Sequence, residues 1–204
     1  MRHALVGCAV FASVSLASAA AAAKVEATFT LSIHVAREDG APAQTNAWID
    51  AQIARAEMLF GPIGVHFQRE DGAPVPDRLA HVETRADRDE LGQAIDRGRI
   101  SVYLVSSLRD VDTPALHRQG VHWRPVSRPS RHFVILAAYA GSTTLAHELG
   151  HFFGNGHTST PQNVMSYLRV GDAVFFDEKQ QRTIASFAGI YLRSKELVPV
   201  AKAD

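Results

Sequence analysis

Three histidines and one glutamate fall within residues 147–157, which read His-Glu-Leu-Gly-His-Phe-Phe-Gly-Asn-Gly-His. His147 and His151 are four residues apart, so on a helix their imidazoles share one face, about 6 Å apart along the axis. Both rings can then reach one metal ion at about 2.0–2.1 Å. Glu148 lies beside His147, near such an ion but not in line to bind it. A carboxylate placed there can hold and deprotonate a water molecule.

Gly154 comes three residues after His151 and predicts the end of this helix. A glycine adopts the left-handed conformation that turns the chain, and the turn brings His157 back as a third ligand. Three neutral imidazoles without a thiolate leave a fourth position for water, as in catalytic zinc sites. The alternative, a buried helix with incidental polar residues, would leave costly polar groups in the core. We therefore predict one catalytic zinc ion held by His147, His151 and His157.

The elements that must position this run alternate between strands and helices, as hydrophobic periodicity indicates. Strands are expected at 28–35, 63–68, 100–106 and 132–138. Helices are expected at 46–60, 87–97, 144–153 and 177–193. Residues 107–131 contain three prolines and are expected to form a long irregular loop. This order predicts an α/β sandwich followed by a smaller C-terminal part of loop and helix.

The run at 147–157 resembles the signature of the metzincin zinc metallopeptidases, in which a methionine turn follows the third histidine. Asn-Val-Met-Ser-Tyr at residues 163–167 supplies that second element, with Met165 as the turn methionine. The resemblance implies an α/β (α+β) metzincin-like fold. It would have a twisted mixed sheet with helices in an N-terminal subdomain, an active-site helix, and a small C-terminal subdomain with the methionine turn and a terminal helix. It also implies that Met165 forms an apolar floor under the three histidines.

Tyr167, two places after Met165, resembles the pattern of astacins, serralysins and pappalysins. In astacins and serralysins that tyrosine approaches the zinc and stabilises the oxyanion of the transition state. The resemblance thus implies two catalytic residues, Glu148 and Tyr167. The alternative for Tyr167 is a packed aromatic with a satisfied hydroxyl. The edge strand with which the family pairs an extended substrate would correspond to residues 132–138.

Residues 1–23 have the pattern of a secretory signal peptide: a charged start, a short apolar middle and small residues before Lys24. An uncleaved membrane anchor is the alternative, since the stretch is just long enough to span a bilayer. Lipidation at Cys8 is a weaker alternative, because too few residues precede it. Cleavage removes Cys8, the single cysteine, and with it any thiol ligand or disulfide. We expect export to the periplasm or the medium.

One catalytic domain is expected at 24–204, with an upper subdomain at about 24–154 and a lower one at about 155–204. The full 204-residue chain has a formal net charge of 0, which gives no reason to expect a nucleic-acid partner. A 46% hydrophobic and 21% charged composition is typical of a soluble globular protein. We expect a monomer without stable membrane association once the signal is removed.

Several other polar residues could bind ions or substrate, but their patterns are weak. His117 and His122 match no tight metal spacing, and surface or packing roles are favoured. The basic residues of the 107–131 loop indicate either a preference for acidic substrates or a solvated surface; they are Arg124, Arg128 and Arg131. Calcium is possible but unsupported, because no oxygen-ligand loop is recognisable around the acidic residues Asp172, Asp177 and Glu178.

Together these patterns predict an exported zinc-dependent endopeptidase acting on protein or peptide substrates. Zinc-bound water would attack the peptide carbonyl, with Glu148 as general base. One alternative is a catalytically weak, zinc-containing binding module, which the presence of Glu148 disfavours. Another is a zinc amidase acting on a non-protein amide such as a cell-wall peptide.

Overall fold

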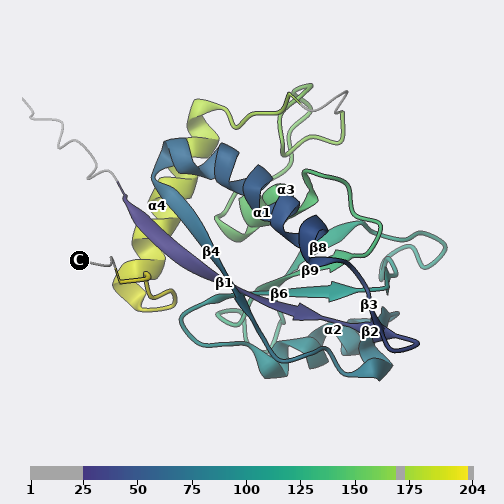
Figure 1. The fold of residues 1–204 in the computed structure, drawn as a ribbon. Helices are drawn as coiled ribbons and strands as arrows, with labels where there is room; N and C mark the ends of the chain where they lie inside the picture. Colours follow the sequence, from purple (N-terminus) through teal and green to yellow (C-terminus); the bar gives the residue numbers. More distant parts are fainter. Residues whose placement is uncertain (1–24, 169–172, 202–204) are drawn as a thin grey trace, which may run out of the picture.

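The computed structural model describes residues 25–168 and 173–201, so the expected signal peptide, with Cys8, and Asp172 lie outside the described residues. A twisted five-stranded sheet forms its centre, in the order β4-β1-β6-β9-β8 (Figure 1). Its strands are β1 (Ala27–Val35), β4 (Val65–Asp71), β6 (Ile100–Val105), β8 (Gly120–Trp123) and β9 (Phe133–Ala137). All neighbours pair in parallel except β8, which is antiparallel to β9. The mixed α/β sheet predicted from the sequence is confirmed.

Four α-helices, three short 3-10 helices and two small strand pairs complete the described fold. The α-helices are α1 (Asn46–Phe60), α2 (Arg85–Leu91), α3 (Thr144–Phe152) and α4 (Glu178–Ser194). The short strands are β2 (Arg37–Glu38), β3 (Ala41–Pro42), β5 (His81–Val82) and β7 (Ser107–Leu108), paired as β2-β3 and β5-β7. Among the described residues, no helix is both long and apolar enough to span a bilayer.

The apolar core has two layers because alternate residues of a strand point to opposite faces of the sheet. In β9, Val134 and Leu136 pack in the cluster that includes residues of α1, α3 and α4. Phe133 and Ile135 pack on the other face, in the cluster that includes residues of α2. Figure 1 shows α1, α3 and α4 on one side of the sheet and α2 on the other. This explains why the sequence of β9 is continuously apolar.

The edge strand expected at residues 132–138 is a wrong prediction. That segment corresponds to β9, which lies between β6 and β8, so the edge on that side of the sheet is β8. The stretch 107–131, expected to be irregular, therefore contains both β7 and β8. A strand of four residues is too short to give a clear period, so its pairing with β9, rather than its own sequence, determines it.

Helix α2 also differs from the expected 87–97. It begins at Arg85, because Thr84 and Asp87 form a reciprocal capping box at its start. It ends at Leu91, where the chain tightens into a 3-10 turn over Gly92–Ala94. Helix α1, by contrast, has the expected bounds, with the Thr45 side chain accepting a hydrogen bond from the main-chain N of Trp48.

Candidate metal centre and active site

Helix α3 and the turn after it bring the three predicted histidine ligands together. His147 and His151 lie on α3, and Gly154 then turns the chain with a φ of 86°. The Nε2 atom of His151 is 3.1 Å from Nε2 of His147 and 3.0 Å from Nε2 of His157. The candidate ligand atoms of all three lie within 4.8 Å of one another. The predicted left-handed turn at Gly154 is confirmed.

Main-chain carbonyls fix which ring nitrogens of this cluster carry hydrogen. Nδ1 of His147 is 2.7 Å from the carbonyl oxygen of Val164, and Nδ1 of His151 is 2.8 Å from that of Asn155. A carbonyl oxygen only accepts, so each Nδ1 donates and each Nε2 of the neutral rings keeps its lone pair. Two lone pairs about 3 Å apart repel unless a cation lies between them, and two nitrogens bound to one tetrahedral zinc are about 3.3 Å apart. The donor set therefore fits a zinc ion.

Burial favours the neutral, metal-binding form of two of these histidines, His151 and His157. Loss of hydration lowers the pKa of His151, opposed by its bond to the Asn155 carbonyl. Burial also lowers the pKa of His157, and the positive charge of Arg118 lowers it further. Because a protonated imidazole cannot coordinate, both effects favour metal binding near neutral pH.

Met165 lies beneath the active-site helix and is fully buried. A Cβ built on Gly150 would come within 2.3 Å of the Met165 sulfur, so helix and turn are in direct contact. Asn163 holds the turn: its Oδ1 accepts from the main-chain N of Met165 at 2.8 Å, and its Nδ2 donates to Gln180 of α4 at 2.7 Å. Met165 thus packs directly against helix α3, and its role as a floor under the three histidines stays a prediction.

Glu148 and Tyr167 line the same cleft as the three histidines, a hollow of about 680 Å³. Glu148 is buried, and its Oε2 accepts a hydrogen bond from the main-chain N of His122 in β8 at 2.7 Å. Tyr167 is 66% exposed, unlike the packed aromatic that the alternative expected. Its hydroxyl oxygen is 3.0 Å from Nε2 of His157. A carboxylate and a phenol therefore both border the histidine cluster.

Solved metalloproteinase structures share this architecture. Metalloproteinase-II from Bacteroides fragilis matches with a TM-score of 0.55 and 16% identity, over 81% of this chain and 54% of that one. Archaemetzincin from Methanopyrus kandleri matches with a TM-score of 0.52 and 18% identity, over 80% of this chain and 96% of that one. Mirolysin in complex with compound 9 gives 0.58 and 11%, over 85% of this chain and 96% of that one. The chain has a metzincin-like fold.

At these identities the comparison establishes the fold, and the chain spans about half the length of the Bacteroides fragilis protein. No family model and no curated protein sequence matches the chain. The details of the metzincin-like site therefore rest on this chain's own residues.

The metzincin-like cleft is bordered by charges of both signs. Its basic residues are Arg88, Arg118 and Arg124, and its acidic ones besides Glu148 are Asp110 and Asp112. Arg118 pairs with Asp110 at 2.5 Å, and Arg88 lies over the Trp123 ring, 4.9 Å from its centroid. Of the basic loop residues predicted to face either substrate or solvent, Arg124 is thus the one that lines the cleft.

The other residues considered from the sequence, where the structure describes them, do not cluster as a further metal site. Within residues 25–168 and 173–201, His147, His151 and His157 are the only clustered ligand group. Asp177 instead caps α4 by accepting from the main-chain N of Gln180 at 2.9 Å. Glu178, on the first turn of α4, pairs with Arg182 at 3.4 Å.

Sequence reasoning missed two parts of the site. The first is β8, whose His122 amide reaches Glu148; its only sequence signal is that His122 stands between the apolar residues Val121 and Trp123. The second is the pairing of His122 with His132, two histidines that the sequence separates by ten residues. No local pattern signals such a contact, because it depends on strands that meet only in the folded sheet.

Proposed function

We propose that this chain is a zinc-dependent endopeptidase. The observation that carries the proposal is the convergence of three imidazole Nε2 atoms, two of them oriented by main-chain carbonyls, beside a buried carboxylate. His147, His151 and His157 would hold the ion. When bound, zinc acts as a Lewis acid that polarises a carbonyl and lowers the pKa of water.

The chain's own residues supply the proton transfer and the charge stabilisation. Glu148 accepts the proton of the attacking water and returns it to the leaving amine nitrogen. The main-chain amide of His122 holds the carboxylate in place. Tyr167 carries an exposed hydroxyl next to His157, where it can donate to the oxygen that becomes negative in the transition state.

Strand β8 supports a polypeptide as the substrate. It is an edge strand of the sheet, and its residues Gly120–Trp123 all line the cleft that contains the histidines. An extended peptide can add to such an edge through main-chain hydrogen bonds, which give affinity without strong sequence selection. We therefore propose β8, instead of the segment expected from the sequence, as the peptide-binding edge.

The test compares wild type with Glu148→Gln on a broad peptide library, with zinc measured in both proteins. The glutamine keeps an acceptor for the His122 amide but cannot take a proton. We expect one zinc per chain in both proteins and cleavage by the wild type alone. Equal cleavage by both would contradict the role of Glu148.

The same assay separates the alternatives. A wild type that binds zinc but cleaves no peptide would support a binding module. A wild type that releases products only from cell-wall peptides would support a zinc amidase. Neither outcome is favoured by a specific contact in the cleft.

We further propose that residues 1–23 direct export and are removed before Lys24, leaving a monomeric domain at 24–204 in the periplasm or medium. The support is the sequence pattern of that segment. Expression of the full chain in a bacterial host, followed by N-terminal sequencing of the periplasmic fraction, tests the cleavage. Recovery of the intact N-terminus in the membrane fraction would indicate an uncleaved anchor.

A further inference from the structure

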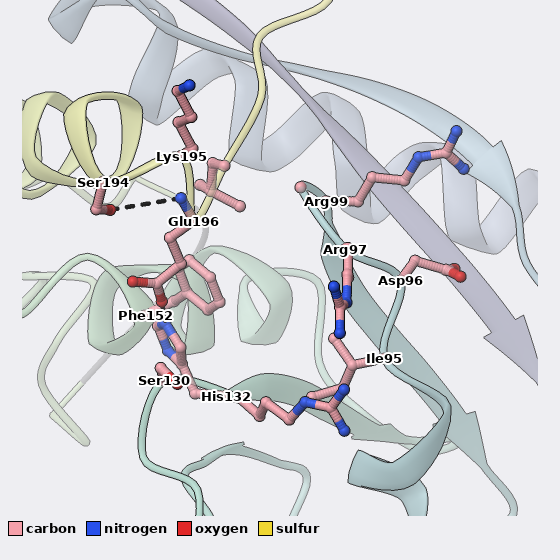
Figure 2. Close-up of a pocket in the computed structure, with 13 residues that line it drawn as sticks. Ile95, Asp96, Arg97, Arg99, Ser130, His132, Phe152, Ser194, Lys195 and Glu196 are labelled. Atoms are coloured by element: carbon pink, nitrogen blue, oxygen red, sulfur yellow. Dashed lines mark hydrogen bonds and ion pairs between the residues drawn. The ribbon is translucent and has the colours of Figure 1, made fainter.

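Two histidines outside the metal cluster hydrogen-bond to each other beside α3. Nε2 of His122 and Nδ1 of His132 are 2.7 Å apart, and Nε2 of His132 is 2.6 Å from Oε1 of Glu196. The His132 ring stacks on Phe152, with centroids 4.0 Å apart and planes 14° apart. Figure 2 shows His132, Phe152 and Glu196 together in the wall of a cavity of about 420 Å³. Glu196, His132 and His122 therefore form a continuous hydrogen-bonded chain.

The direction of this chain follows from its carboxylate end. An ionised carboxylate only accepts, so Nε2 of His132 carries the hydrogen and its Nδ1 is an acceptor. Nε2 of His122 must then donate to that Nδ1. Burial lowers the pKa of both histidines, which keeps both rings neutral and the direction defined. Since His132 uses both of its ring nitrogens, it has none left for a metal.

The His122 end of this hydrogen-bonded series reaches the proposed general base, Glu148. His122 lies in β8, and its main-chain N donates to Oε2 of Glu148 at 2.7 Å. β8 also lies directly on α3, because a Cβ on Gly120 would be 2.7 Å from Thr144 and 3.0 Å from Glu148. The side chain of His122 is thus anchored on one side while its amide holds a carboxylate on the other.

We propose that Glu196 and His132 are positioning residues that act through His122 to hold its main-chain amide against the Glu148 carboxylate. The inference rests on the proposed function, because it concerns the group that would move the proton. The segment after α4 would in this way set the place of β8, through a contact between Glu196 and His132, which are 64 residues apart in the sequence. The ring nitrogens of His132 bond to His122 and Glu196 and so lie outside the three-histidine cluster.

Packing alone does not require a histidine at position 132. The His132 side chain is only 1% exposed, and a phenylalanine of similar shape could stack on Phe152 there. A polar ring in such a place is costly unless both of its nitrogens are bonded, which is what Glu196 and His122 provide. These directional hydrogen bonds fix the distance and orientation between the segments that carry Glu196, His132 and His122, which an apolar contact does not.

The first experiment records ring nitrogen chemical shifts of the zinc-loaded wild type by NMR. We expect both His122 and His132 as neutral rings with the hydrogen on Nε2. A hydrogen on Nδ1 of His132, or a charged ring, near neutral pH would overturn the proposed hydrogen-bond series from His122 through His132 to Glu196. This measurement needs no variant and no activity.

The second experiment compares Glu196→Ala, Glu196→Gln and Glu70→Ala with wild type, all loaded with zinc. Glu70→Ala is the matched control, because Glu70 pairs at 2.6 Å with Arg99, another residue that lines the same cavity. The readouts are zinc content, hydrogen exchange of the His122 amide, kcat and KM. Glu196→Gln keeps an acceptor for His132 and should therefore retain the slow amide exchange and the kcat that Glu196→Ala loses.

We expect Glu196→Ala to expose the His122 amide to at least about tenfold faster exchange and to lower kcat by about tenfold, with zinc content unchanged. Glu196→Gln and Glu70→Ala should stay close to wild type in both readouts. Wild-type exchange and kcat in Glu196→Ala would overturn the proposal.

The result remains separable from the proposed function. If the wild type cleaves no peptide, the proposed function fails, yet amide exchange still decides whether Glu196 holds the His122 amide. If Glu196→Ala does not fold, the ring tautomers of the wild type and the hydrogen exchange of the His122 amide in Glu196→Gln decide whether Glu196 holds that amide. In Glu196→Gln, fast hydrogen exchange of the His122 amide despite an Nε2 hydrogen on His132 would contradict the proposal.

Discussion

Gly150 of the active-site helix lies directly against the sulfur of Met165, leaving no room for a side chain. A Cβ on Gly150 would be 2.3 Å from Sδ and 3.2 Å from Cε of Met165, and 3.3 Å from the Phe176 ring. The glycine is thus required by the close approach of the methionine turn, one residue before the proposed ligand His151.

Gly150→Ala should therefore destabilise the protein and weaken zinc binding. Alanine is the better helix former by about 1 kcal/mol, but here its methyl group must displace Met165 or Phe176 from a closely packed floor. We expect a lower unfolding midpoint, measured by urea denaturation, and a larger zinc Kd. Both measurements use the chain from Lys24 onward.

Gly189→Ala is the matched control for this prediction. Gly189 is also inside a helix, α4, but its Cβ would meet only the end of the Arg193 side chain at 3.2 Å and Val25 at 3.9 Å. That flexible end can move, so the helix propensity of alanine should keep or raise stability. If Gly150→Ala behaved like Gly189→Ala, the close contact with Met165 would not control the site.

Tyr167→Phe should lower kcat while leaving the zinc content unchanged. The hydroxyl oxygen is 3.0 Å from Nε2 of His157, and the ring is 4.6 Å from the His157 ring, centroid to centroid. Removing one oxyanion donor costs about 10²–10³ in kcat. Steady-state kinetics with a cleaved peptide measure the loss. An unchanged kcat would show that the ring, through its contact with His157, is the part that matters.

The histidine cluster could be predicted from the sequence because its geometry is local. The spacing of His147 and His151 fixes one helix face, and a left-handed Gly154 returns His157 within six residues. The sheet was also largely predictable, since the sequence of β1 alternates, β6 is nearly continuously apolar and β9 is continuously apolar.

The wall of the cleft could not be predicted, because it forms by pairing of distant segments. Strand β8 has four residues, and its register with β9 is what carries the His122 amide to Glu148. The contact of Glu196 with His132 joins residues 64 apart in sequence. Neither contact leaves a periodic pattern, so sequence reasoning assigned the edge of the sheet to the wrong strand.

Acid should destabilise the metal-free protein through His122 and His132. Burial lowers the pKa of His122 to about 2, helped by the charges of His132 and Arg124, and burial lowers that of His132 despite Glu196. Below the unfolded value of about 6.5 the unfolded chain binds protons that the folded chain excludes. The free energy of unfolding should therefore fall with falling pH, by up to about 1.4 kcal/mol per pH unit for each excluded proton.

Urea unfolding at pH 7, 6 and 5 in the presence of a chelator measures this slope. His122→Gln removes one of the two buried rings, so the slope of its free energy of unfolding against pH should be smaller by the contribution of about one proton. A free energy of unfolding that stays flat between pH 7 and 5 would mean that these rings accept protons in the folded chain.

His66 should give a pH dependence of the opposite sign. A hydrogen bond from His66 to Glu57 raises the pKa of His66, opposed by burial and supported by the charges of Glu57 and Glu26. A raised folded pKa means that the stabilisation is fully present below the unfolded value of about 6.5 and is lost as pH rises through the folded value. The ring is about a third exposed, so the loss between pH 6 and 8 should stay below about 1 kcal/mol. His66→Gln should abolish that decline in urea unfolding, and high salt should reduce it in the wild type. An identical decline in both proteins would assign it to another group.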